Sequence, residues 1–83
     1  MNHLQQQILD LLEPLVEALI EYPDEMEIDI QETGSTVVVC LDLVPSDRAK
    51  VIGKGGKIIN GLRSYFTAFG GRHEKAILLE VIE

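Results

Sequence analysis

The chain has little of what metal sites, disulfides and membrane anchors require. It contains one cysteine and two histidines, and no apolar run approaches the ~20 residues of a membrane-spanning helix. Cys40 cannot form an internal disulfide and lies in an apolar stretch, so we expect a small buried side chain there and not a reactive thiol. His3 and His73 have no second cysteine to complete a metal-ligand pattern, so we expect neither a metal nor another cofactor.

The length of the chain sets a second limit. A sequence of 83 residues can bury one modest core, but it leaves no room for a second domain or a deep catalytic cleft, which argues against an enzyme. Its 46% hydrophobic and 25% charged residues are typical of a folded globular chain and not of a disordered one. The start of the sequence lacks the basic residues and apolar core of a signal peptide, so we expect a cytoplasmic protein.

Basic residues are missing from the first half of the chain. Residues 1–47 contain eleven Asp and Glu and no Lys or Arg, whereas residues 48–83 contain seven basic and three acidic residues. The two parts therefore carry −11 and +4, which add up to the net charge of −7. Because distant charges are screened over about 10 Å at moderate salt, a polyanion responds to the local potential of the face that it meets. A nucleic-acid partner is therefore compatible with the second part alone.

Apolar residues at three- and four-residue steps predict an amphipathic helix over residues 1–21, and we expect its apolar stripe to cover a sheet. Pro14 interrupts the pattern, so the helix either kinks there or begins near Pro14 behind a looser segment. Tyr22 precedes Pro23, and this pair ends the helix because a residue before proline is pushed out of the helical region.

Three strands are expected after this helix. Apolar and polar residues alternate over residues 26–31, which predicts a half-buried strand. After a turn at residues 33–35, the β-branched run over residues 36–44 predicts a central strand that pairs antiparallel with the first. In the run over residues 75–82, Glu80 is the only charged residue after Lys75, which predicts a third, largely covered strand.

Two helices are expected between the second and third strands. Ser46 as an N-cap and Asp47 in the first turn predict a short helix from about Asp47 to Ile52. Helical apolar spacing resumes after Gly56, and Gly70-Gly71 predicts the end of that second helix. Strands joined through helices run parallel, so the order predicts an α+β fold with a three-stranded mixed sheet and helices packed on one face.

The glycine loop, Gly53-Lys54-Gly55-Gly56, lies between these two helices in the basic part of the chain. Glycine removes the Cβ that would hold a ligand's backbone away, and N–H groups at the start of the next helix can bind phosphate. The loop is not a P-loop, because only three residues separate Gly53 from Lys57. It is not a dinucleotide fingerprint either, because Ile58 stands where the third glycine belongs. A G-x-x-G loop between helices remains, and this loop clamps nucleotide backbones in KH domains.

The run from Val51 to Ile59 resembles the V-I-G-x-x-G-x-x-I signature of KH domains, and the order of elements matches the bacterial type II KH arrangement over nearly the whole chain. The length and the step from Tyr22-Pro23-Asp24-Glu25 into a strand further resemble the small single-KH bacterial proteins of the KhpA (YlqC) family. Two features depart from the family pattern. Residues 1–13 with Pro14 look like an extension of its first helix, and Gly61 lies inside the second KH helix, where glycine costs about 1 kcal/mol relative to alanine.

The resemblance implies a single domain, with the N-terminal helix over residues 1–21 on the sheet and the KH domain over residues 22–83, that binds single-stranded RNA. The glycine loop would grip the backbone while bases lie in a shallow apolar groove. The expected site residues are Arg48, Lys50, Ile52, Gly53, Lys54, Gly55, Gly56, Lys57, Ile59 and Arg63. Ile52 and Ile59 would form the groove floor, although a pure core role for Ile59 fits equally well. Without an aromatic residue beside the loop, we expect modest affinity.

A second hypothesis is a protein-interaction module. Small KH proteins of this family associate with themselves and with a larger Jag-type KH protein (KhpB/EloR). The resemblance therefore implies a homodimer or a heterodimer with a role as RNA chaperone or post-transcriptional regulator linked to cell-envelope and cell-shape control. Ile58 and Tyr65, one heptad apart, are the expected interface residues. The two hypotheses are compatible, because a second copy strengthens a weak RNA-binding groove by avidity.

Overall fold

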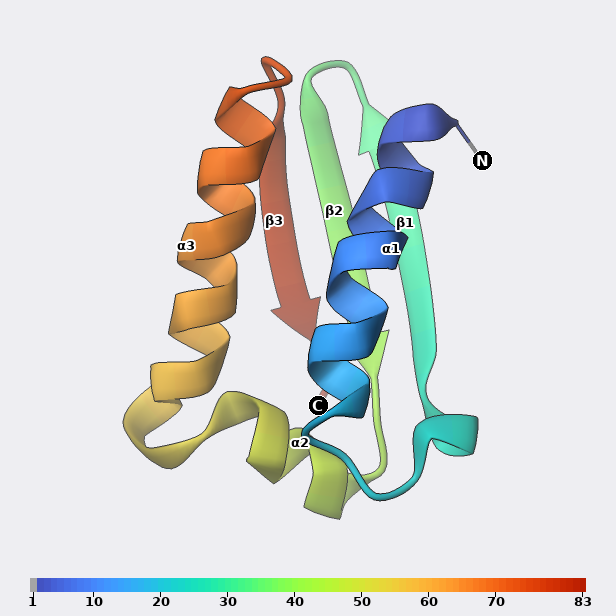
Figure 1. Ribbon diagram of the computed structural model, residues 1–83, viewed down its shortest axis with the longest axis vertical. Coiled ribbons are helices and arrows are strands. Elements are labelled where there is room, and N and C mark those ends of the chain that lie inside the picture. Colours follow the sequence, from blue (N-terminus) through green and yellow to red (C-terminus); the bar gives the residue numbers. More distant parts are fainter. Residues whose placement is uncertain (1) are drawn as a thin grey trace.

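The computed structural model describes residues 2–83 and shows three helices on a three-stranded sheet (Figure 1). No helix in this range is long and apolar enough to cross a membrane. The order of elements confirms the predicted α+β arrangement. The elements are α1 (His3–Glu17), β1 (Glu27–Thr33), β2 (Thr36–Asp42), α2 (Pro45–Ile52), α3 (Lys57–Gly71) and β3 (Ala76–Val81), with 3₁₀ turns at Pro23–Glu25 and Lys54–Gly56.

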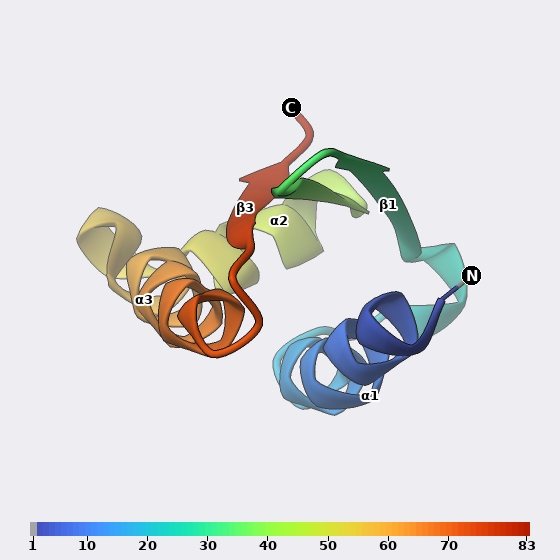
Figure 2. The same ribbon diagram turned by 90° about the horizontal axis from the view of Figure 1, so that it is seen from above.

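The sheet is mixed, as predicted, with β2 in the centre. β1 pairs antiparallel with β2, in a register that places Ile28 opposite Leu41. β3 pairs parallel with β2, and Val39 lies opposite Leu79. Seen from above, α1 and α3 lie on the same side of this sheet (Figure 2). The sheet therefore has one face covered by helices and one open face.

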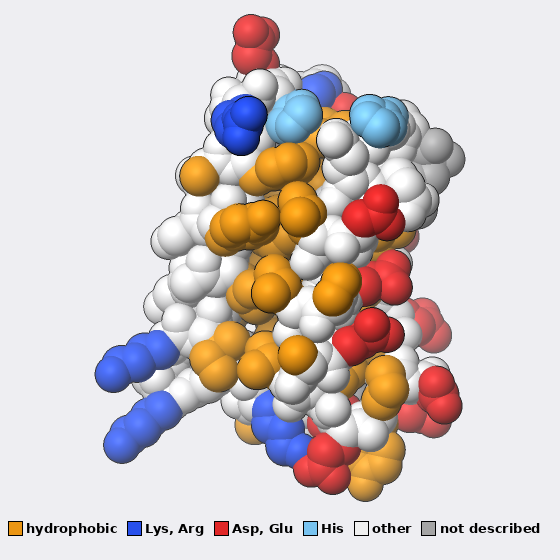
Figure 3. All heavy atoms as spheres, in the orientation of Figure 1, with side chains coloured by type: hydrophobic (Ala, Val, Ile, Leu, Met, Phe, Trp, Pro, Cys, Tyr) orange, Lys and Arg blue, Asp and Glu red, His pale blue; other side chains and the backbone are white. Residues whose placement is uncertain are grey.

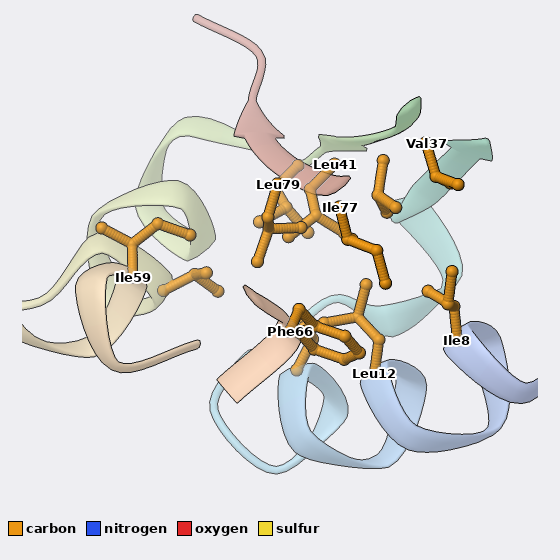
Figure 4. Close-up of a cluster of buried hydrophobic side chains, with 12 residues drawn as sticks. Ile8, Leu12, Val37, Leu41, Ile59, Phe66, Ile77 and Leu79 are labelled. Carbon is orange, nitrogen blue, oxygen red and sulfur yellow. The ribbon is translucent and has the colours of Figure 1, made fainter. Parts of the chain in front are cut away.

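The core fills the space between the covered face and the helices. Phe66 of α3 and Leu12 of α1 approach each other below the sheet, between the two helices that carry them (Figure 4). Burying side chains of this size contributes about 1.5–3 kcal/mol each. The buried apolar residues are Ile8, Leu12, Val16, Val37, Val39, Leu41, Leu43, Val51, Ile59, Phe66, Ile77 and Leu79.

Helix α1 runs through Pro14, so the alternative of a helix that begins near this proline is wrong. The side chain of Asn2 caps the first turn by accepting a hydrogen bond from the N–H of Gln5 at 2.8 Å. Fully buried residues lie on both sides of the proline, which itself is exposed, so packing against the sheet holds both parts of the helix. The helix ends at Glu17, earlier than the predicted residue 21.

Helix α3 ends at Gly71, as the Gly70-Gly71 pair predicted, but neither glycine caps it in a left-handed conformation. Gly70 is buried where α3 meets the start of β3, and a Cβ on it would lie 2.5 Å from the backbone oxygen of Lys75. The glycine therefore serves a close approach of helix and strand. The left-handed conformation that usually ends a helix occurs instead at Glu74, with φ 57°.

The prediction of a largely covered third strand is wrong for one of its two faces. Along β3, buried and exposed residues alternate, and Leu78 is 48% exposed. The reason is that no layer of residues 2–83 covers the open face of the sheet. Cys40 is half-buried and not buried, because in β2 it alternates with the inward-facing Val39 and Leu41 and so lies on that face.

A polar network ties the end of β1 to the start of α1 and to the segment before β3. The carboxylate of Glu32 accepts hydrogen bonds from Lys75 Nζ at 2.7 Å, Asn2 Nδ2 at 2.9 Å and Gln5 Nε2 at 3.2 Å. These bonds, that from Lys75 most of all, lower the pKa of Glu32 from 4.5 to about 2.

We predict that this network stabilises the fold in a pH-dependent way. Because the folded-state pKa is depressed, the contribution of Glu32 is fully present above its ordinary pKa of 4.5 and is lost as the pH falls to about 2. The measurement is the urea midpoint as a function of pH for the natural chain and Glu32→Gln. The difference between the two urea midpoints should shrink as the pH falls from 4.5 to about 2. A difference that stays constant would contradict the stabilising role of ionised Glu32.

Candidate nucleic-acid interface

The glycine loop is a tight turn between α2 and α3, as predicted. Its three glycines all have positive φ: 77° at Gly53, 63° at Gly55 and 77° at Gly56. At Gly53 a Cβ would lie 2.7 Å from Cγ1 of Ile58, so this position requires glycine for space as well as for conformation. A Cβ at Gly55 would meet nothing within 4 Å. Gly53 therefore shapes the loop, while Gly55 is its open surface.

The loop offers fewer free N–H groups than the sequence suggested. The N–H of Gly53 donates to Ala49 O at 3.0 Å, the N–H of Gly56 donates to Gly53 O at 3.1 Å, and the N–H of Lys57 donates to Lys54 O. The N–H groups of Lys54 and Gly55 make no hydrogen bond within the part of the chain that the structure describes. These two groups are the ones available to a phosphate.

A shallow cleft opens beside the loop, between α3 and the end of β3. It brings together four predicted residues, Ile52, Gly56, Ile59 and Arg63. Ile59 is only 4% exposed and belongs to the core, so its two predicted roles coincide at the bottom of this cleft. The cleft also contains residues that the sequence reasoning missed: Asn60, Val81 and Glu83.

One of the missed residues carried a usable signal. Asn60 lies one helical turn after Gly56, and its Nδ2 would be 3.3 Å from a Cβ at that glycine. Val81 and Glu83 reach the cleft only because β3 pairs with β2 and passes next to α3, which no local pattern predicts.

The predicted basic residues differ in how freely their side chains could contact a nucleic acid. Lys54 and Lys57 are exposed, and basic side chains project into solvent where the loop joins the two helices (Figure 3). Lys50 instead forms an ion pair with Glu21, and this hydrogen bond raises the pKa of Lys50. It is thereby held toward the segment after α1 and does not extend toward the loop.

The two predicted arginines are also less free to contact a nucleic acid than Lys54 and Lys57. Arg63 donates from Nε to Leu79 O at 3.0 Å and from Nη1 to Asn60 Oδ1 at 3.4 Å, which fixes its guanidinium across the cleft wall. Arg48 is half-buried, and its buried Nε makes no hydrogen bond within residues 2–83. Nothing in the structure explains that buried Nε.

The predicted interface residues on α3 are exposed. Ile58 is 36% and Tyr65 47% exposed. Apolar side chains form a stripe along the gap between α1 and α3, bordered by acidic side chains on the α1 side (Figure 3). We call this surface the apolar stripe. The exposed or half-buried apolar side chains that α1, α3 and the residues just after α1 carry include Leu4, Leu11, Leu15, Leu19, Ile58, Leu62, Tyr65 and Phe69.

The start of α2 differs from the prediction in the role of its polar residues. The N-cap is Val44, with Pro45 in the first turn, and no side chain caps the helix, so the expected N-cap role of Ser46 is wrong. A proline is tolerated here because the first turn needs no N–H donor. Asp47 is fully buried and accepts hydrogen bonds from the backbone N–H groups of Glu21, at 3.0 Å, and Tyr22, at 2.9 Å.

A G-x-x-G turn between two helices, next to a mixed sheet in which the last strand pairs parallel with the central one, defines a KH domain with the type II order of elements. The chain belongs to the KhpA/KhpB KH-domain family, whose model matches residues 9–81. The match begins inside α1 and covers every later helix and strand.

Curated relatives align over nearly their whole length. The chain is 32% identical over 74 residues to the RNA-binding protein KhpA of Listeria monocytogenes strain EGD-e, an alignment that covers 89% of this chain and 97% of the relative. It is 35% identical over 74 residues to the protein of the same name from Aquifex aeolicus, covering 89% and 94%. With that of Oceanobacillus iheyensis it shares 38% over 72 residues, covering 87% and 96%. No solved structure matches the chain.

Proposed function

We propose that this chain is a single-stranded RNA-binding KH protein of the cytoplasm, and not an enzyme. The observation that carries the proposal is the glycine loop, where two unbonded N–H groups and the exposed Lys54 and Lys57 lie beside an apolar cleft. The curated relatives, which bear the name RNA-binding protein, support it.

In the proposed mode of binding, the glycine loop holds the RNA backbone and the cleft holds the bases. A phosphate accepts from the N–H groups of Lys54 and Gly55 while the lysine side chain supplies charge. Bases lie in the cleft, where Ile52 and Ile59 offer apolar contact and Asn60 offers an amide. No aromatic side chain lines the cleft, so binding lacks strong stacking and stays modest.

The first prediction from the proposed function concerns the loop surface. Aspartate at Gly53 is unsuitable as a test, because Gly53 has no room for a Cβ. Lys54→Asp with Gly55→Asp is better suited, because Lys54 is exposed and Gly55 faces open space with a left-handed φ that strains aspartate less than most other residues. This double variant should weaken binding of an unstructured RNA 12-mer about tenfold or more, since carboxylates replace a cation at the phosphates. Fluorescence anisotropy measures the change.

A matched control lies at the other end of α3 (Figure 1). Gly71→Asp with Arg72→Asp makes the same two types of change at exposed positions, so the net charge falls equally. This control should bind RNA within about twofold of the natural chain, because screening separates it from the loop. Equal loss of affinity in both double variants would show that overall charge, and not the loop, governs binding.

The second prediction concerns salt. Of the predicted cations, Lys50 is paired with Glu21, Arg63 is bonded across the cleft wall, and Arg48 is half-buried, which leaves the exposed Lys54 and Lys57 for phosphates. Two phosphates at roughly −0.7 each give a slope of about −1.4 for log K against log salt. Titrations between low and moderate salt measure the slope. A slope near zero would contradict backbone clamping.

A second function is favoured by the apolar stripe. We propose that the chain also self-associates, or pairs with a larger Jag-type KH protein (KhpB/EloR), through the stripe on α3. Monomeric proteins seldom expose a continuous apolar surface like that in Figure 3, and Ile58 and Tyr65 are exposed apolar side chains of α3. A role as RNA chaperone or regulator in cell-envelope and cell-shape control, which the family resemblance implies, belongs to this proposal. Two weak RNA sites in one assembly would gain avidity.

The third prediction tests this surface with Tyr65. Ile58 is a poor choice for mutation because it packs against Gly53 and supports the loop. Light scattering of the natural chain at micromolar concentration should show a dimer, and Tyr65→Glu should convert it to a monomer that binds RNA more weakly. Leu78→Glu is the control: it is 48% exposed, against 47% for Tyr65, but lies on the open face of the sheet. A natural chain that is monomeric at that concentration would refute self-association.

A further inference from the structure

Asp47 is the one charged side chain that is fully buried within residues 2–83. Its Oδ1 accepts from the N–H of Glu21 at 3.0 Å, and its Oδ2 accepts from the N–H of Tyr22 at 2.9 Å. Both N–H groups belong to the segment that connects α1 with β1. A buried carboxylate is costly unless hydrogen bonds compensate its lost hydration, so these two bonds fix α2 and this segment to each other.

Helix α2 has few other attachments. It contains eight residues, no side chain caps its start, and only Asp47 and Val51 are buried in it. By contrast α1 and α3 each have 15 residues and bury three. A helix of two turns is unstable by itself, so its position depends on what its inward side chains contact. The ion pair of Lys50 with Glu21 adds a second link between the same two segments.

The position of α2 in turn sets the geometry of the glycine loop. The N–H of Gly53 closes the last turn of α2 on Ala49 O at 3.0 Å, and Ile52 of this helix lines the cleft. Asp47 itself is not among the cleft residues and has no exposed surface with which to contact RNA. Its influence on the loop therefore passes through the helix.

We propose that Asp47 is a positioning residue for RNA binding: by holding the backbone N–H groups of Glu21 and Tyr22, it places α2 so that the glycine loop and Ile52 meet the RNA together. This inference rests on the proposed RNA-binding function. It implies that a carboxylate that contacts no nucleotide influences the affinity for RNA. It also implies that the segment after α1 helps to position the RNA site.

The test is Asp47→Asn. The amide has almost the same shape, but its NH₂ group faces one of the two N–H donors, so one hydrogen bond is lost and two donors oppose each other. RNA affinity should fall about tenfold at a temperature where the variant is fully folded. The amide NMR signals of Gly53, Gly55 and Gly56 should shift in the variant without RNA.

The matched control is Glu32→Gln, the same carboxylate-to-amide change in a network at the opposite end of β1 from α2 (Figure 1). It should lower the midpoint of thermal unfolding but leave RNA affinity and the loop glycine signals unchanged. If Asp47→Asn also lowers only the midpoint and leaves affinity and glycine signals as in the natural chain, Asp47 is merely structural and the proposal is refuted.

Two further arrangements keep the result decisive. Should Asp47→Asn not fold, Asp47→Ser replaces it, because its hydroxyl oxygen still accepts one N–H and places no donor against the other. Should the natural chain bind no RNA, the proposed function fails, but the glycine signals still report whether Asp47 sets the loop. Unshifted glycine signals in a folded Asp47 variant would overturn the positioning role independently of RNA.

Discussion

The packing of α1 and α3 against one face of a three-stranded sheet is the interaction on which the rest of the molecule depends. A chain of this size has a single core, and Phe66 and Leu12 fill it from the two helices (Figure 4). Because α3 must lie close to β3, Gly70 is needed at the end of α3 that meets the start of this strand. The other end of α3, with the glycine loop, then lies beside the end of β3. The cleft beside the loop therefore results from the packing of α3 against β3.

The loop combines a fixed part with an open part. Gly53 is held on one side by the hydrogen bond to Ala49 O and on the other by contact with Ile58. Gly55 has nothing near it and keeps an unbonded N–H group, as does Lys54. Under the proposed function, such a preformed loop would need little reordering to bind a phosphate, so little ordering free energy would oppose binding. Side chains that hold the loop, Ile58 among them, would therefore influence the proposed RNA site without belonging to it.

The structural features that depend on neighbouring residues in the sequence were predicted from local patterns. The features that were missed depend on long-range contacts. Alternation over residues 26–31 and the β-branched run that follows predicted β1, β2 and their pairing, because strand periodicity is a local property. The glycine loop was predicted for the same reason. Asp47, however, bonds to N–H groups 25 and 26 residues away, and Lys50 pairs with a residue 29 positions away. Glu83 reaches the cleft through the pairing of β3 with β2. No local pattern contains such contacts.

The distribution of charge acquires a structural explanation from these contacts. Acidic residues of the first half neutralise basic residues that lie away from the glycine loop: Glu21 pairs with Lys50, and Glu32 pairs with Lys75. Arg63 donates to a backbone carbonyl instead. Among the predicted site residues, Lys54 and Lys57 are the exposed cations to which residues 2–83 supply no ion pair or side-chain hydrogen bond, and they lie in and next to the loop that carries the two free N–H groups. With a net charge of −7, the surface beyond the loop is unfavourable for a polyanion, so under the proposed function an RNA strand would make one short contact. One such contact would bind weakly, which is the physical reason for proposing a second copy of the site.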